Sequence, residues 1–148
     1  MAKAYYSTVL DYRADDVWAV IRRFDHYAWA GVEADTVIED DKRGDQVSAV
    51  RRVTTGNNVL RQKLLAHSDH DRSYTYCLVD PSPFPVRDYT ATIRVGEVVA
   101  DNTAFVEWWA TFDCDLGERN RWVEHFERRG FATWLTALDK FMARARQA

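Results

Sequence analysis

The chain has 148 residues, 47% of them hydrophobic, and a formal net charge of -3, which suits one globular domain. Acidic and basic residues are interleaved, and basic runs stop at pairs such as Arg22-Arg23, so nucleic acid is not expected as a partner. No segment approaches the roughly 20 apolar residues of a membrane span, and the first ten residues lack a signal-peptide core, so we expect a cytoplasmic protein without stable membrane insertion.

Strand and helix periodicities follow one another in a simple order. A strand at residues 3–12 precedes a short helix at 16–24, which Asp15 is expected to cap. The segment 25–31 fits either one further helical turn or a loop. Alternating apolar and polar residues between turn-forming segments then predict six more strands, at residues 32–39, 46–54, 59–67, 73–80, 87–98 and 103–113.

The C-terminal segment is predicted to be one long amphipathic helix. Between residues 121 and 146, apolar side chains recur mostly every three or four positions, from Val123 and Phe126 to Met142. Strands joined by short connectors pair antiparallel, and the last two strands each offer one apolar face to a cover. The expected fold is α+β: a seven-stranded antiparallel sheet curved around the C-terminal helix, in a single domain over residues 1–148.

A two-residue turn at Gly56-Asn57 sets the register of two neighbouring strands. This register places Arg51 opposite Gln62 on a face that is otherwise apolar. The inward set is then Val47, Ala49, Arg51, Val53, Leu60, Gln62 and Leu64, joined by Tyr74, Tyr76, Leu78, Tyr89 and Trp108 from later strands. The two polar residues need an explanation, because a buried polar group is costly when it is unpaired.

Two interpretations of Arg51 stay open. In the first, its guanidinium faces a pocket in which polar groups orient a bound molecule between aromatic walls. That pocket would be formed by Arg51, Gln62, Tyr76, Tyr89, Trp108, Phe126 and Trp134. In the second, Arg51 packs its stem at the mouth of the cup and its head reaches water, Glu33 or Asp35.

Three segments resemble those of a known family: residues 83–89 (Pro-Phe-Pro-Val-Arg-Asp-Tyr), 108–113 (Trp-Trp-Ala-Thr-Phe-Asp) and 130–135 (Gly-Phe-Ala-Thr-Trp-Leu). Together with the order of elements, they make the chain similar to the bacterial polyketide cyclase/dehydrase-like branch of the START-related helix-grip superfamily (SRPBCC). That superfamily also contains birch-pollen-allergen-type proteins and plant abscisic acid receptors. The resemblance implies a ligand cavity between sheet and helix, with functions that range from lipid carriage to cyclisation.

The resemblance also implies loop and cavity positions. Gly56 and Asn57 lie where the plant receptors have their gate loop, and residues 86–89 look like their latch. The chain lacks the gate proline, the latch histidine and any lysine between residues 28 and 41, so the resemblance does not extend to abscisic acid. The further candidates are Pro85, Arg87 and Asp88 at the rim and Leu78, Gly130 and His26 in the ligand-binding set.

Few side-chain clusters could carry catalysis or bind a metal. Residues 67–70 (His-Ser-Asp-His) have the composition of a metal site but lie at a hairpin tip, where a solvated turn is expected instead. His26, His125, Asp25 and Asp88 are candidates for proton transfer, although packing and capping roles are commoner for such residues. No phosphate loop, nucleophile elbow or zinc spacing is present in the sequence, so no catalytic residue, metal or cofactor is assigned.

The leading hypothesis is a cofactor-free protein that binds a small hydrophobic or amphipathic molecule in the cavity. The runner-up is a cyclase, aromatase or dehydratase, in which Tyr76, Tyr89 or Arg51 polarises a carbonyl and His26 or Asp88 moves a proton.

A third hypothesis is a protein-interaction module. Strand parity sends Trp109 to the outer face of the sheet, and an exposed tryptophan often marks a contact surface. We therefore also predict a weak homodimer.

Overall fold

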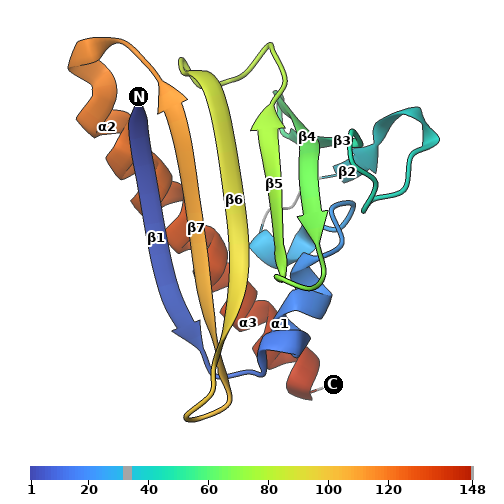
Figure 1. The fold of residues 1–148 in the computed structure, drawn as a ribbon. Helices are drawn as coiled ribbons and strands as arrows, with labels where there is room; N and C mark the ends of the chain where they lie inside the picture. The colour runs from blue at the N-terminus through green and yellow to red at the C-terminus, as the bar shows by residue number, and fades with distance from the viewer. Residues whose placement is uncertain (32–34, 148) are drawn as a thin grey trace.

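The computed structural model describes residues 1–31 and 35–147 of the chain. In this part, seven antiparallel strands form one sheet in the order β1-β7-β6-β5-β4-β3-β2 (Figure 1). The strands are β1 (Ala2–Leu10), β2 (Asp35–Ile38), β3 (Val50–Thr55), β4 (Asn58–Ser68), β5 (Ser73–Leu78), β6 (Arg87–Val98) and β7 (Thr103–Asp113). The predicted α+β fold with an antiparallel meander is confirmed.

The helices lie on one side of the sheet. The short helix α1 (Ala14–Ile21) packs against β6 and β7. The C-terminal helix consists of α2 (Arg119–Glu124), a π-helical segment (His125–Phe131) and α3 (Ala132–Gln147), and it runs behind the sheet in Figure 1. The predicted cap of α1 is wrong: the cap position is Arg13, without a side-chain bond to the helix, and Asp15 instead accepts a hydrogen bond from Arg72 Nε.

The π-helical segment accommodates an irregular step in the apolar pattern. The buried hydrophobic side chains of this helix are Trp122, Phe126, Phe131, Leu135, Leu138 and Met142, with a single five-residue step from Phe126 to Phe131. In a regular α-helix that step would turn the second side chain away from the first. The wider π turn, with its i→i+5 bonding, keeps both against the sheet.

The register around the β3–β4 hairpin agrees with the prediction. Arg51 pairs with Gln62 and Val53 with Leu60. The expectation for Val47 is wrong, because the strand begins at Val50 and Val47 is 52% exposed. Ser48 has a φ of 79°, so the chain turns there and carries Val47 out of the sheet. The predicted strand start at residue 32 lies outside the described residues.

Aromatic side chains dominate the interior between sheet and helix. Trp108 on β7 stacks on Phe131, with ring centroids 5.0 Å apart, and lies 5.9 Å from Trp29. The inner face is therefore mostly packed rather than hollow. In the described part of the chain, none of the helices combines the length and apolarity that crossing a bilayer requires.

Candidate functional site

Arg51 is fully buried on the inner face of β3, with 0% of its surface exposed. Its Nε donates to Gln62 Oε1 at 2.5 Å, and its Nη1 donates to the Phe24 backbone carbonyl at 3.4 Å. Its Nη2 is buried without a hydrogen-bond partner among the described residues. The second interpretation, in which the guanidinium reaches water, is therefore wrong. Of its proposed partners, Asp35 is exposed on β2, and Glu33 lies outside the described residues.

Four aromatic rings surround the guanidinium. Its central carbon lies 4.0 Å from the ring centroid of Tyr27, 4.2 Å from Phe24, 5.4 Å from Tyr76 and 6.0 Å from Tyr74. These distances allow cation–π attraction. We call these four residues and Arg51 the arginine box.

Several polar atoms in and beside the arginine box lack a partner. The Tyr27 and Tyr74 hydroxyls and the Trp29 indole nitrogen are buried without hydrogen bonds among the described residues. Native proteins leave few such groups unpaired, so each one needs an explanation. Burial raises the pKa of Tyr27 and of Tyr76 well above the ordinary value, so both hydroxyls are neutral at pH 7 and can donate hydrogen bonds.

An apolar cavity of about 200 Å³ opens beside the arginine box. Its lining consists of Tyr27, Val53, Asn58, Leu60, Pro83, Phe84 and Trp134. The pair Val53–Leu60 is the next inward-facing pair along β3 and β4 after Arg51–Gln62, about 7 Å away. Tyr27 belongs to both sites, because its ring stacks on the guanidinium and also lines the cavity.

The structure brings several predicted site residues into contact with one another. Trp108 Nε1 donates to the Tyr76 hydroxyl at 3.2 Å. Tyr89 and Phe126 pack against each other with centroids 5.1 Å apart. Trp134 lines the cavity itself.

Other predicted residues lie elsewhere. Leu78 and Asp88 line a second hollow of about 260 Å³ beside Tyr89. His26 packs on Phe141, with centroids 5.9 Å apart, and does not line the cavity. Gly130 is buried behind Trp134, where an added Cβ would lie 3.3 Å from the indole ring, so this glycine gives the tryptophan room.

The predicted loop residues lie around the rim. Gly56, with a φ of 58°, and Asn57 form the exposed β3–β4 turn, next to Asn58 in the cavity wall. Pro85 and Arg87 are exposed. Asp88 is also exposed and has a φ of 53°, at an irregularity in the β6–β7 pairing.

The prediction missed three residues that shape the site: Tyr27, Trp29 and Phe84. Tyr27 and Trp29 lie in the segment between α1 and β2, which has no strand or helix periodicity to indicate which way a side chain points. Phe84 comes from the proline-rich rim loop, yet it packs on Phe126 of the C-terminal helix with centroids 5.4 Å apart. Its position between two prolines was the available signal.

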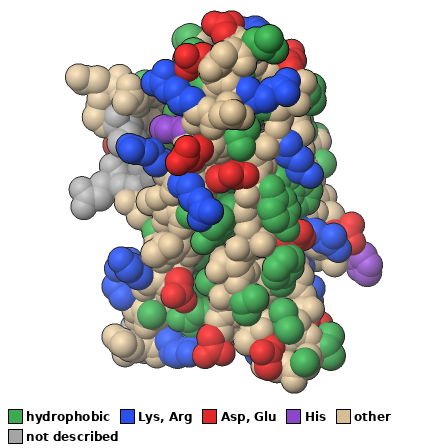
Figure 2. Space-filling view, turned by 90° about the vertical axis from the view of Figure 1, so that its left-hand side faces the viewer, with side chains coloured by type: hydrophobic (Ala, Val, Ile, Leu, Met, Phe, Trp, Pro, Cys, Tyr) green, Lys and Arg blue, Asp and Glu red, His purple; other side chains and the backbone are tan. Residues whose placement is uncertain are grey.

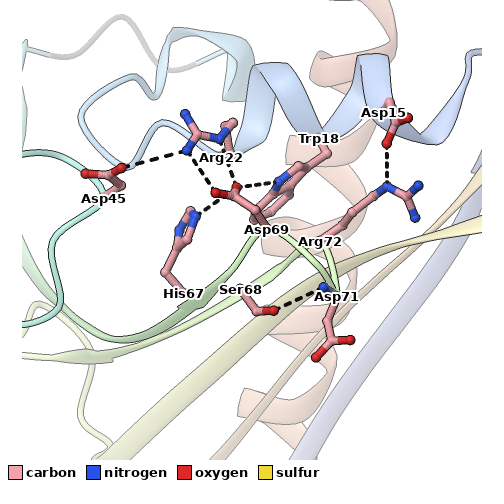
Figure 3. A network of polar contacts seen from close by, with 9 residues as sticks. All are labelled: Asp15, Trp18, Arg22, Asp45, His67, Ser68, Asp69, Asp71 and Arg72. Carbon is pink, nitrogen blue, oxygen red and sulfur yellow. Dashed lines mark hydrogen bonds and ion pairs between the residues drawn. The ribbon is translucent and has the colours of Figure 1, made fainter.

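The hairpin tip after β4 holds α1. The Asp69 carboxylate accepts hydrogen bonds from Trp18 Nε1 at 2.9 Å, Arg22 Nε at 3.0 Å and His67 Nε2 at 3.0 Å (Figure 3). The expectation of a solvated turn is wrong for His67, whose side chain is 10% exposed. A bulge between Leu64 and Ala66 shifts the strand parity and turns His67 inward, opposite Tyr74.

The sheet gripping a long C-terminal helix, with aromatic side chains between them, defines the helix-grip class of α+β proteins. The chain belongs to the family described as polyketide cyclase/dehydrase and lipid transport, whose family model matches residues 1–148. The resemblance inferred from the sequence is thereby confirmed.

Solved structures agree with this assignment. A protein from Thermobifida fusca is 27% identical, with a TM-score of 0.83 over 97% of this chain and 95% of that chain. XoxI from Bacillus cereus is 26% identical, with a TM-score of 0.81 over 95% and 94% of the two chains. Norcoclaurine synthase from Thalictrum flavum, solved with dopamine and hydroxybenzaldehyde, shares the fold: 12% identity and a TM-score of 0.74 over 96% and 86%. The comparison with curated proteins found no match.

Proposed function

We propose that this protein binds a small hydrophobic or amphipathic molecule between the sheet and the C-terminal helix. The observation that carries the proposal is the apolar cavity of about 200 Å³ that adjoins a buried guanidinium. Ligand sites are mostly apolar hollows with a few convergent polar groups. The family description, which includes lipid transport, supports the same function.

The energetics of the proposed binding follow from the lining. Val53, Leu60, Phe84 and Trp134 offer apolar surface, and burial of such surface contributes about 25 cal/mol per Å². The polar groups of the arginine box contribute less energy and fix the orientation of the ligand.

Catalysis of a cyclase or dehydratase type is the second candidate. The observation that favours it is the pair of neutral hydroxyls of Tyr76 and Tyr89, whose pKa values burial raises, together with the Arg51 cation 5.4 Å from the Tyr76 ring. Such donors polarise a carbonyl oxygen. A proton-transfer base is the missing part: His26 packs on Phe141, Asp88 is exposed, and no carboxylate or imidazole lines the cavity in the described part of the chain. Binding is therefore the better supported function.

A cavity-filling substitution tests the binding proposal. We expect Leu60→Trp to weaken the binding of the neutral fluorescent probe N-phenyl-1-naphthylamine at least tenfold, because the indole occupies the hollow. The matched control is Val59→Trp, since Val59 is the adjacent residue of β4 and is 44% exposed. Probe fluorescence measured against protein concentration gives both affinities. Equal binding by the two variants, or no binding by the unmodified protein, would overturn the proposal.

A further inference from the structure

We infer that the ligand is a monoanion, a carboxylate or an enolate attached to an apolar body, and that Arg51 is its counterion. This inference rests on the proposed function and narrows it to acidic ligands. It arises from the charge and hydrogen-bond balance of the arginine box.

Among the residues that the structure describes, nothing compensates the positive charge of the arginine box. A guanidinium stays protonated in proteins, and the acceptors that Arg51 has, Gln62 Oε1 and the Phe24 carbonyl, are both neutral. No carboxylate forms an ion pair with Arg51 in the described part of the chain. A buried charge without a counter-charge is costly, and cation–π contacts with neutral rings supply no counter-charge. An anionic ligand would supply the missing charge.

The unpartnered atoms also call for an acceptor. The Arg51 Nη2 and the Trp29 indole nitrogen can only donate hydrogen bonds, and the Tyr27 and Tyr74 hydroxyls can donate too. The groups are contiguous: Tyr27 lies 4.0 Å from the guanidinium carbon and 5.3 Å from the Trp29 ring. Carboxylate or enolate oxygens match this set. A phosphate dianion does not, because its second charge would stay uncompensated.

Tyr27 connects this donor set to the apolar cavity. Its ring forms part of the cavity wall and covers the guanidinium at 4.0 Å. With the ligand body on the Val53–Leu60 pair, an acidic head about 7 Å farther along the strands meets Arg51 and Gln62. Entry of that head requires the Tyr27 ring to turn aside. The Tyr27 ring thus separates the Arg51 guanidinium from the cavity until an acidic ligand displaces the ring.

Matched acids and alcohols test the inference by isothermal titration calorimetry at pH 7.5. The pairs are 3-phenylpropanoate with 3-phenylpropan-1-ol and octanoate with octan-1-ol, which differ within each pair only in the head group. We expect the unmodified protein to bind at least one acid tenfold or more tightly than its alcohol. Arg51→Met should abolish that preference. Arg52→Met should keep it, because Arg52 is the adjacent exposed residue of the same strand and loses the same charge.

The outcomes separate this inference from the proposed function. Acids and alcohols of equal affinity, or acid binding that Arg51→Met leaves unchanged, would overturn the inference alone. The same holds if none of the four compounds binds while N-phenyl-1-naphthylamine does. If that neutral probe also fails to bind, the binding function itself is refuted. Circular dichroism checks that Arg51→Met is folded, and the comparison on the unmodified protein decides the question even if it is not.

Discussion

Among single residues, Arg51 and Gln62 stand apart because they place a charge and an amide in an otherwise aromatic interior. Gln62 is 3% exposed and accepts the shortest hydrogen bond that the guanidinium makes. Buried polar pairs of this kind are often dispensable for stability. Their retention in the core is then better explained by ligand binding than by folding.

This view predicts a non-additive effect on stability. Gln62→Leu alone should lower the free energy of unfolding by about 2 kcal/mol, because Arg51 loses its main acceptor. The double variant Arg51→Met/Gln62→Leu should recover that loss, because it replaces both partners by apolar groups. Urea unfolding of the four members of the cycle measures the coupling. Two additive losses would instead show that the pair stabilises the fold.

The sequence predicted this pair because a hairpin turn and strict strand alternation suffice to set cross-strand partners. It also placed Tyr74 and Tyr76 on the same inward face, but it did not place Phe24 or Tyr27 against the guanidinium. Phe24 is the last residue of the helix predicted at 16–24, whereas Tyr27 and Trp29 lie in an irregular segment, where the direction of a side chain depends on tertiary packing. The candidate site was thus partly predictable, and the residues that were missed came from two irregular segments, the one between α1 and β2 and the proline-rich rim loop.

Between elements, the most concentrated polar contact ties α1 to the β4–β5 hairpin. The Asp69 carboxylate accepts hydrogen bonds from three side chains, those of Trp18, Arg22 and His67 (Figure 3). The hydrogen bonds from Arg22, and then those from Trp18 and His67, hold the pKa of this carboxyl well below its usual range. The charged form of Asp69 is therefore the one that stabilises the fold.

Removal of this carboxylate should loosen α1 in a pH-dependent way. We expect Asp69→Ala to lower the free energy of unfolding by about 1 kcal/mol at pH 7. The effect is modest because the Asp69 side chain is 57% exposed. Because the pKa is lowered on folding, the contribution is complete above the unfolded pKa, about 3.9. It declines as the pH falls below that value. In urea unfolding, the difference in the free energy of unfolding between Asp69→Ala and the unmodified protein should be smaller at pH 3 than at pH 7.

Asp71→Ala is the matched control for this experiment. Asp71 belongs to the same hairpin, is exposed, and has no side-chain hydrogen bond or ion pair in the described structure. An equal loss in both variants, or a difference that does not change with pH, would contradict the assigned role of Asp69.

Element boundaries were predictable where alternation was unbroken. The strands β6 and β7 match the predicted limits of 87–98 and 103–113. The errors occur where the backbone departs from regular geometry: the positive φ at Ser48, the bulge before His67 and the π turn before Phe131. Each adds a local irregularity that a strict period of two or 3.6 residues does not describe.

On the scale of the whole molecule, no helix in residues 1–31 and 35–147 covers the outer face of the sheet. Trp109 lies on this face between Tyr5 of β1 and Thr92 of β6. Tyr5 is 39% exposed, and its hydroxyl donates to Glu107 at 2.6 Å. Seen from the side of β1, the surface mixes hydrophobic side chains with charges of both signs (Figure 2). Aromatic residues on such a face favour a weak protein contact.

The predicted homodimer can be measured directly. Light scattering at high protein concentration should give a mass above that of one chain, 17.2 kDa, and Trp109→Glu should return the mass to that of the monomer. Val59→Glu, an exposed hydrophobic position on another strand, adds the same charge and should leave the mass unchanged. A single-chain mass for the unmodified protein would exclude the dimer.

The fold as a whole was the most predictable level, because seven strands and one helix each repeat their pattern often enough to outweigh local errors. The extent of hollow space was the least predictable. Ring-on-ring packing such as that of Trp108 and Phe131 depends on distances that strand parity does not supply.

The five-residue step between Phe126 and Phe131 fixes how the two halves of the last helix are oriented about their common axis. Each residue of an α-helix advances by about 100°, so if the wide turn became regular α-helix without losing a residue, everything after it would rotate by about that angle. Leu135 and Leu138 would then swing from the sheet toward water. Removal of one residue from the turn, for instance Gly130, would instead leave a regular four-residue step and keep the same side chains against the sheet.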